Sequence, residues 1–149
     1  MLQWQKKCHT VKTVVISSPD RQILFVSNTW LGKEHDYTLL KEEFPPSGNW
    51  FENFELRLDS GYQGFEKDYK CKKCYIPQKK KRNSELSAEQ KAENKELAKE
   101  RIRVEHSIGG LKRYRILSDR VRIRDYQLFD QIIGVCAGLW NYIKIDTND

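Results

Sequence analysis

Two acidic residues, Asp59 and Glu105, lie in sequence settings where a carboxylate can hold a metal ion. Asp59 closes the alternating segment FELRL and precedes the turn SGYQG, and active sites of open α/β sheets gather at the ends of strands. Glu105 lies in the helical segment RIRVEHSIGGLKRYR, where about 3.6 residues per turn align Arg101, Glu105, Ile108 and Lys112. A carboxylate flanked by two cations suits metal-assisted phosphoester chemistry, because the carboxylate binds the metal while Arg and Lys bind phosphates.

Each acid also has a plain structural explanation, which is the better one when the acid is taken alone. An Asp before Ser-Gly is ordinary turn chemistry, and Glu105 fits an exposed helix whose salt bridges contribute about 0.3–0.5 kcal/mol each. The side chain of His106 points about 100° away from Glu105 around the helix. We therefore expect His106, like His35, to pack or to orient a neighbour rather than to bind metal. Asp36 is interpreted first as a helix N-cap and second as an accessory acid.

The charge of the chain is uneven, with a net charge of +6 over 149 residues. Residues 65–124 contain 19 Lys and Arg against 9 Asp and Glu, whereas the remainder contains 8 against 12. This basic region indicates an anionic partner. Nucleic acid fits better than a membrane, because no long apolar face accompanies the basic runs. The expected DNA-backbone contacts are Lys79, Lys80, Lys81, Arg82, Arg101, Lys112, Arg113, Arg115, Arg120, Arg122 and Arg124. For the run KKKR, a solvated surface is an equal alternative.

The first half of the chain is predicted to contain the strands that position Asp59. Segments 9–17 and 22–29 are rich in β-branched and alternating residues, and the turn between them predicts an antiparallel hairpin. A short helix is expected from Asp36, followed by a strand over 54–58 that ends at Asp59. Another short strand is expected near 75–76, before a basic loop.

The second half is predicted to be helical. Ser87 and Gln90 fit a capping box that begins a long helix, which extends to about Leu117 and is interrupted by the pair Gly109-Gly110. A final amphipathic helix covers 125–143, and its apolar residues are Leu128, Ile132, Ile133, Val135, Leu139 and Trp140. The order of elements indicates one α/β domain over residues 1–149, with its helices late in the chain.

The four cysteines indicate a reducing compartment rather than a disulfide framework. No secretory signal or membrane span is visible, so we expect a cytoplasmic protein, associated with the nucleoid if its source is bacterial. Cys71 and Cys74 have zinc-ligand spacing, but only Cys8 and His9 are candidates to complete four ligands, so the zinc signal is weak. Cys136 lies on an apolar helix face and is expected in the core.

Several ordered motifs together resemble a known family. The strings LDSGYQG, IPQKK and ELSAEQKAENKELAKERIRVEHSIGGLKRYRIL resemble bacterial insertion-sequence transposases of the DDE superfamily and the similar Harbinger-like endonucleases. The upstream segment with Gly32, His35 and Asp36 resembles the family as well. The resemblance implies an RNase H-like fold in which three acids bind two divalent cations, Mg²⁺ or Mn²⁺, for DNA cleavage and strand transfer. It assigns the second Asp to Asp59 and the Glu to Glu105.

The resemblance also extends to the helix around Glu105, with two departures. Arg101 and Lys112 match the family's Arg and Lys spacing, whereas Ala98 stands where the family usually has tyrosine. The family's first Asp lies on a first strand that would precede this sequence. We therefore expect a partial RNase H-like domain that lacks this strand and is inactive alone. An upstream-frame transposase segment would supply the missing acid, unless the chain is a relic.

Two alternatives to a catalytic transposase domain remain open from the sequence. The first is a non-catalytic DNA-binding fragment or relic of a transposase. The second is a basic nucleic-acid-binding protein unrelated to transposition, which leaves the ordered motifs unexplained. The expected partners are DNA, as transposon ends and target, and the upstream segment. The oligomeric state stays open, with a homo-oligomer among the options.

Overall fold

Short strands in the first half of the chain form three separate two-stranded sheets. The structure is a computed structural model, and it describes residues 11–79, 85–119, 123 and 125–146. The strands are β1 (Val11–Lys12), β2 (Val15–Ser17), β3 (Ile23–Val26), β4 (Trp30–Leu31), β5 (Glu55–Arg57) and β6 (Lys73–Tyr75). β1 pairs antiparallel with β4, β2 pairs antiparallel with β3, and β5 lies parallel to β6.

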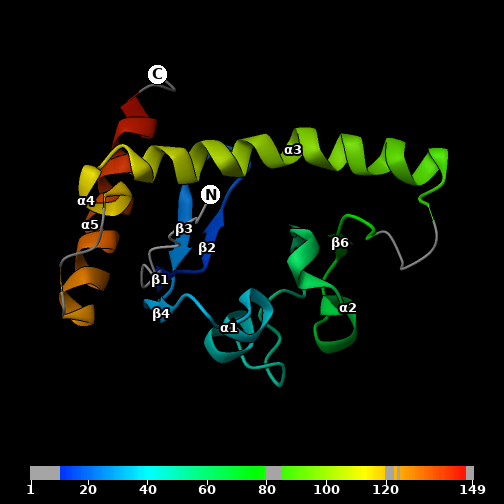
Figure 1. Ribbon diagram of the computed structural model, residues 1–149, viewed down its shortest axis with the longest axis horizontal. Coiled ribbons are helices and arrows are strands. Elements are labelled where there is room, and N and C mark those ends of the chain that lie inside the picture. Colours follow the sequence, from blue (N-terminus) through cyan, green and yellow to red (C-terminus); the bar gives the residue numbers. More distant parts are fainter. Residues whose placement is uncertain (1–10, 80–84, 120–122, 124, 147–149) are drawn as a thin grey trace, which may run out of the picture.

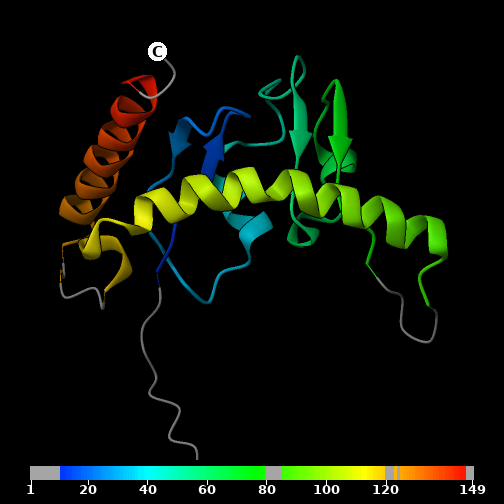
Figure 2. The same ribbon diagram turned by 90° about the horizontal axis from the view of Figure 1, so that it is seen from above.

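One long helix runs past two of these sheets. The helices are α1 (Asp36–Glu43), the 3-10 turn η1 (Ser60–Tyr62), α2 (Phe65–Asp68), α3 (Ala88–Lys112), α4 (Arg115–Ser118) and α5 (Tyr126–Asp146). In Figures 1 and 2, the C-terminal part of α3 passes β2 and β3, while its middle passes β6. The predicted α/β class, with its helices late in the chain, is confirmed.

The predicted hairpin forms between β2 and β3, but the strand expected over 9–17 is broken. Residues 9 and 10 lie outside the described part of the chain. At the break, buried Val14 donates its N–H to Ser27 Oγ at 2.9 Å, and Val14 O accepts from Ser27 N at 2.9 Å. This bend leaves β1 to pair with β4 instead of continuing into β2. A continuous strand is therefore wrong here, because Val14 turns into the core.

The N-cap role predicted for Asp36 is also wrong. His35 is the N-cap residue of α1 and makes no side-chain capping bond, while Asp36 is the first helical residue. The Asp36 carboxylate instead accepts a hydrogen bond from Lys12 Nζ at 2.9 Å. A charged partner from β1 therefore takes the place of the local backbone bond that the sequence suggested.

The start of α3 follows the prediction, and its end does not. Ser87 Oγ accepts from Gln90 N at 3.2 Å and Gln90 Oε1 accepts from Ser87 N at 3.0 Å, which confirms the capping box. The helix passes through Gly109 and Gly110 without interruption and ends at Lys112. A Cβ on Gly110 would lie 2.3 Å from a Trp140 ring carbon. Gly110 therefore serves close helix packing rather than a break.

The final helix, α5, buries one face and exposes another. Cys136, Ala137 and Trp140 are buried in one cluster with Ile23 of β3 and Leu111 of α3, as expected for Cys136. Asn141 receives the Ile23 N–H at 2.7 Å and donates to Ile23 O at 2.8 Å, so α5 is fixed to β3 by two hydrogen bonds. Three of the apolar residues named for the amphipathic helix, however, are exposed, namely Leu128, Val135 and Leu139.

Two hydrophobic clusters support the two ends of the molecule. The first holds Val14, Leu39, Leu40, Phe51, Phe65 and Tyr69. The second holds Ile23, Leu111, Cys136, Ala137 and Trp140. α3 joins the two regions, because its middle contacts the β5 segment while its C-terminal turn enters the second cluster.

Candidate active site

The two predicted acids meet at one guanidinium group. Arg101 Nη1 donates to Asp59 Oδ1 at 3.1 Å, and Arg101 Nε donates to Glu105 Oε1 at 3.1 Å. The Asp59 and Glu105 side chains are each 57% exposed, and Arg101 is 48% exposed. A cation already lies between two carboxylates that come from residues 46 positions apart in the sequence.

Local structure explains why Asp59 points at α3. Backbone pairing with β6 continues past β5, since Leu58 N donates to Tyr75 O at 3.0 Å. Residues two apart on a strand share a face, and Arg57 and Asp59 both contact α3. Asp59 then leaves the strand as the N-cap of η1, where its Oδ1 accepts from Ser60 N at 2.6 Å.

Three further contacts fix the middle of α3 beside β5 and β6. Arg57 forms an ion pair with Glu100, the residue just before Arg101. Arg57 also lies over the Tyr75 ring, 4.9 Å from its centroid. Downstream of β6, Gln78 N donates to Asn94 Oδ1 at 2.9 Å, and Asn94 Nδ2 donates to Gln78 O at 3.0 Å. The position of α3 beside β5 and β6 is thus held at Asn94 and Glu100, in the turns that precede and include Arg101.

A third acid, Asp36, lies near Asp59. A Cβ placed on Gly61 would be 3.8 Å from Asp36 Oδ2. Burial, followed by the negative charges of Asp36 and Asp59, raises the pKa of Tyr62 to about 12. Asp36 therefore shares the neighbourhood of Tyr62 with Asp59. This placement agrees with the second interpretation of Asp36, as an acid near the site, whereas its role there stays a prediction.

Comparison with known proteins now bears on this site. Residues 2–141 match the family model described as DDE superfamily endonuclease. This chain belongs to the DDE superfamily of endonucleases. Over 136 residues it is 38% identical to the probable transposase for insertion sequence element IS702 from Microchaete diplosiphon, which covers 90% of this chain and 46% of the relative. The chain thus spans about half the length of this relative. No solved structure matches the chain.

The donor set of this DDE chain fits the divalent metal ions that the family generally uses. Asp59 and Glu105 offer only oxygen atoms, which Mg²⁺ and Mn²⁺ prefer. The two carboxylates already share one positive partner, the Arg101 guanidinium. Within the described ranges, however, no cluster of three or more acidic, histidine or cysteine side chains is arranged to hold a metal ion. Asp36 therefore does not complete a preformed three-ligand site.

The two histidines beside the motifs of the DDE chain lie at the surface. His35 precedes α1 and His106 follows Glu105 on α3, and both side chains are exposed. A packing role is therefore wrong for both, because neither side chain has a core to enter. An orienting role stays a prediction.

Some of the basic residues expected to contact DNA lie in the described part of the chain, and the others lie outside it. Lys79, Lys112 and Arg115 are exposed, and Arg115 Nη2 lies 3.3 Å from Asp119 Oδ2. Arg113 lies over the Trp140 ring, 5.8 Å from its centroid, so part of its role is packing. The remaining candidates lie outside the described residues and are Lys80, Lys81, Arg82, Arg120, Arg122 and Arg124.

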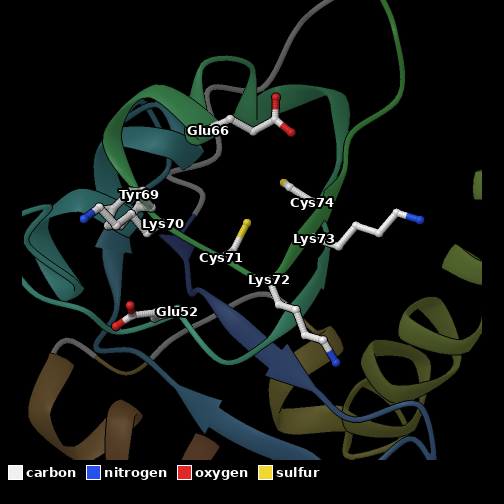
Figure 3. A pocket seen from close by; sticks show the side chains of 8 residues that line it. All are labelled: Glu52, Glu66, Tyr69, Lys70, Cys71, Lys72, Lys73 and Cys74. Atoms are coloured by element: carbon white, nitrogen blue, oxygen red, sulfur yellow. The ribbon is translucent and has the colours of Figure 1, made fainter.

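Cys71 and Cys74 line an open pocket together with Glu52 and Glu66, and neither Asp59 nor Glu105 is among its lining residues (Figure 3). Both cysteines are free and half-buried. Burial, followed by the charge of Cys71, raises the pKa of the Cys74 thiol to about 12, which disfavours the thiolate that zinc needs. The weak zinc interpretation gains no third ligand from the described residues, and Cys8 and His9 lie outside them.

Among the described helices of the chain, none has the length and apolar character to cross a membrane.

Proposed function

We propose that this chain is part of the catalytic domain of a DNA transposase, which cleaves DNA and transfers strands with Mg²⁺ or Mn²⁺. Membership in the DDE superfamily and the name of the related probable transposase support this function. The observation that carries it is the meeting of Asp59 and Glu105 at Arg101, from two different elements. If Asp59 and Glu105 did not lie close together, they could not bind metal ions at one site.

In this proposal, Asp59 and Glu105 hold the divalent cation through oxygen ligands. When bound, the cation supplies activation of an attacking oxygen and stabilisation of the leaving one. Arg101 then releases the carboxylates and contacts a DNA phosphate, a bidentate contact for which guanidinium is well shaped. Lys79, Lys112 and the other basic candidates bind the DNA backbone, transposon ends and target alike, without reading its sequence.

The fold proposed for the complete domain is RNase H-like. β2–β3 and β5–β6 are separate sheets that lie beside the same helix, and within the described part of the chain neither β2 nor β5 pairs with a further strand. A strand inserted between β2 and β5 would join them into one sheet and bring an acid next to Asp59. Such a strand would also cover two open edges, which otherwise favour aggregation. A transposase segment encoded upstream is the proposed source.

We further propose that the 149 residues alone do not cleave DNA. Among the described residues, only Asp59 and Glu105 form ion pairs with Arg101, and two carboxylates bind and orient metal ions less well than three. The alternative function, a non-catalytic DNA-binding fragment or relic, is favoured by the basic stretch 65–124. Both versions bind DNA, and they differ in whether restoring an upstream acid restores cleavage.

A nicking assay on supercoiled DNA with Mn²⁺ tests these proposals. We expect no nicking by the chain alone, and cleavage once an upstream segment with an acidic strand is added. Asp59→Ala should abolish that cleavage, whereas Glu96→Ala, on the same helix but paired with Lys99, should leave it intact. If the chain alone nicks DNA, and Asp59→Ala abolishes that nicking, the proposal that the chain alone is inactive is wrong. Cleavage that is indifferent to Asp59→Ala would overturn the site.

A further inference from the structure

The outer face of α5 carries an apolar stripe exposed to solvent. Leu128, Val135, Leu139 and Tyr142 are 46%, 62%, 48% and 65% exposed. With about 100° between successive residues, these four lie within roughly 60° of one another around the helix. The buried residues Cys136 and Trp140 of the second cluster lie on a different face. We refer to the four exposed residues as the outer stripe of α5.

Charged residues are scarce along α5 before its last turn, although 32% of the chain is charged. Between Tyr126 and Ile143 the only charged residue is Asp130, and its carboxylate accepts a hydrogen bond from Thr29 N at 2.8 Å. The residues that flank the stripe include Gln127, Gln131 and Gly138, which are uncharged. Monomeric soluble proteins seldom leave a continuous apolar stripe of this kind in water. The stripe is therefore suited to contact another protein surface.

We propose that the outer stripe pairs with the same stripe of a second copy of this chain, with the two α5 helices antiparallel. Leu128 and Tyr142 each lie seven residues from Val135, the spacing that keeps a seam facing a partner helix. When two Val135 side chains meet on a two-fold axis, Leu128 of each copy meets Tyr142 of the other. The same patch then serves both copies, as a two-fold interface requires.

A second copy fits the stripe for electrostatic reasons as well. Each chain carries a net charge of +6, so copies repel unless they meet over a neutral surface, and the outer stripe is such a surface. Burying it removes no charged group from water, which avoids a desolvation cost. Antiparallel helices also place the positive end of each dipole beside the negative end of the other.

The side chains around the stripe allow the two helices to approach closely. Gly138 borders the stripe, and a Cβ placed there meets no atom within 4 Å, so this position faces open space. Helix axes approach to about 8–10 Å depending on the side chains between them, and small residues favour the lower end of that range. Since α5 has 21 residues, it is about 31 Å long. One helix pair of this length makes a small interface, so we expect a reversible dimer with micromolar affinity.

Sedimentation equilibrium of the 149-residue chain, up to about 100 µM, measures this association. We expect a monomer–dimer equilibrium that Val135→Glu weakens at least about tenfold, because a charge would be buried at the centre of the seam. Leu24→Glu is the matched control, since Leu24 is 63% exposed on β3, and it should leave the dimer unchanged. Circular dichroism checks that both variants fold.

A monomer at every concentration would overturn the proposal, and so would equal weakening by Leu24→Glu. The monomer result would point to another occupant of the stripe, such as a different part of a longer chain. A dimer that Val135→Glu does not affect would place the contact elsewhere and would also overturn it.

Disulfide trapping tests the direction of the helices. Leu128→Cys and Tyr142→Cys chains, one of them tagged, are mixed and oxidised, with the unsubstituted chain as control for the native cysteines. Antiparallel pairing predicts a mixed disulfide between the two variants. Disulfides that form only between identical variants would overturn the antiparallel arrangement.

Discussion

Arg101 sets the relation between the two acids of the candidate site at the scale of single residues. Its guanidinium donates to Asp59 and to Glu105 through two different nitrogen atoms. The helical spacing of the sequence predicted that Arg101 and Glu105 share one helix face, and Arg101 was expected to bind phosphate. It did not predict that Arg101 would also reach Asp59, because that contact depends on how β5 lies against α3. An arginine in this place competes with any metal ion for the same oxygen atoms.

Replacing Arg101 should therefore change metal binding and DNA binding in opposite directions. In Arg101→Gln we expect Mn²⁺ to bind about two- to tenfold more tightly without DNA, because two exposed ion pairs no longer compete. DNA affinity should fall, since one phosphate contact is lost. Titration of the free Mn²⁺ signal by electron paramagnetic resonance measures the first effect. Arg103→Gln, on the same helix and also exposed, serves as control, and weaker Mn²⁺ binding by Arg101→Gln would contradict the competition.

The secondary-structure elements show which features a sequence can predict. Local signals predicted the capping box at Ser87, the β2–β3 hairpin and the strand that ends at Asp59, because each depends on neighbours a few residues away. The split of the segment 9–17 was missed, since it depends on Val14 bonding to Ser27. The role of Gly110 was missed for the same reason, because its partner, Trp140, lies 30 residues further along the chain.

The adjacent glycines of α3 should respond to alanine with opposite signs. In Gly110→Ala, the new methyl group meets the Trp140 ring, so we expect a loss of about 1–3 kcal/mol in the free energy of unfolding from overpacking. At Gly109 an added Cβ has no atom within 4 Å, so Gly109→Ala should raise that free energy by about 0.5–1 kcal/mol through helix propensity. Urea unfolding followed by circular dichroism measures both. Equal effects at the two positions would show that α5 does not pack on α3 here.

At the scale of the whole molecule, charge is divided along the chain. The basic segment 65–124 contains all of α3 and its flanking loops, while the acidic excess lies in the rest. Two lysines of α3 form ion pairs with acidic residues, in the pairs Lys91–Glu85 and Lys99–Glu96. Local pairing lowers the field that such lysines contribute. Net charge alone therefore overstates the number of cations that can face DNA phosphates.

The salt dependence of DNA binding separates these two kinds of lysine. For Lys79→Ala with Lys112→Ala we expect the slope of log affinity against log salt to fall by about two, because each lost phosphate contact removes about one unit. Lys91→Ala with Lys99→Ala removes the same net charge and should change the slope by much less. Fluorescence anisotropy with a labelled duplex across a salt series measures both. Equal slopes for the two double variants would contradict direct contact by Lys79 and Lys112.

The Gly110–Trp140 contact has a mechanical consequence for the candidate site. Glu105 and Gly110 lie on the same uninterrupted helix, about 7.5 Å apart along its axis. A helix this short moves as a nearly rigid body. The contact between Gly110 and the Trp140 ring therefore helps to set the position of α3, and with it the distance between the carboxylates of Glu105 and Asp59. A partner that displaces α5 would thus change the distance between these two carboxylates, although it touches neither of them.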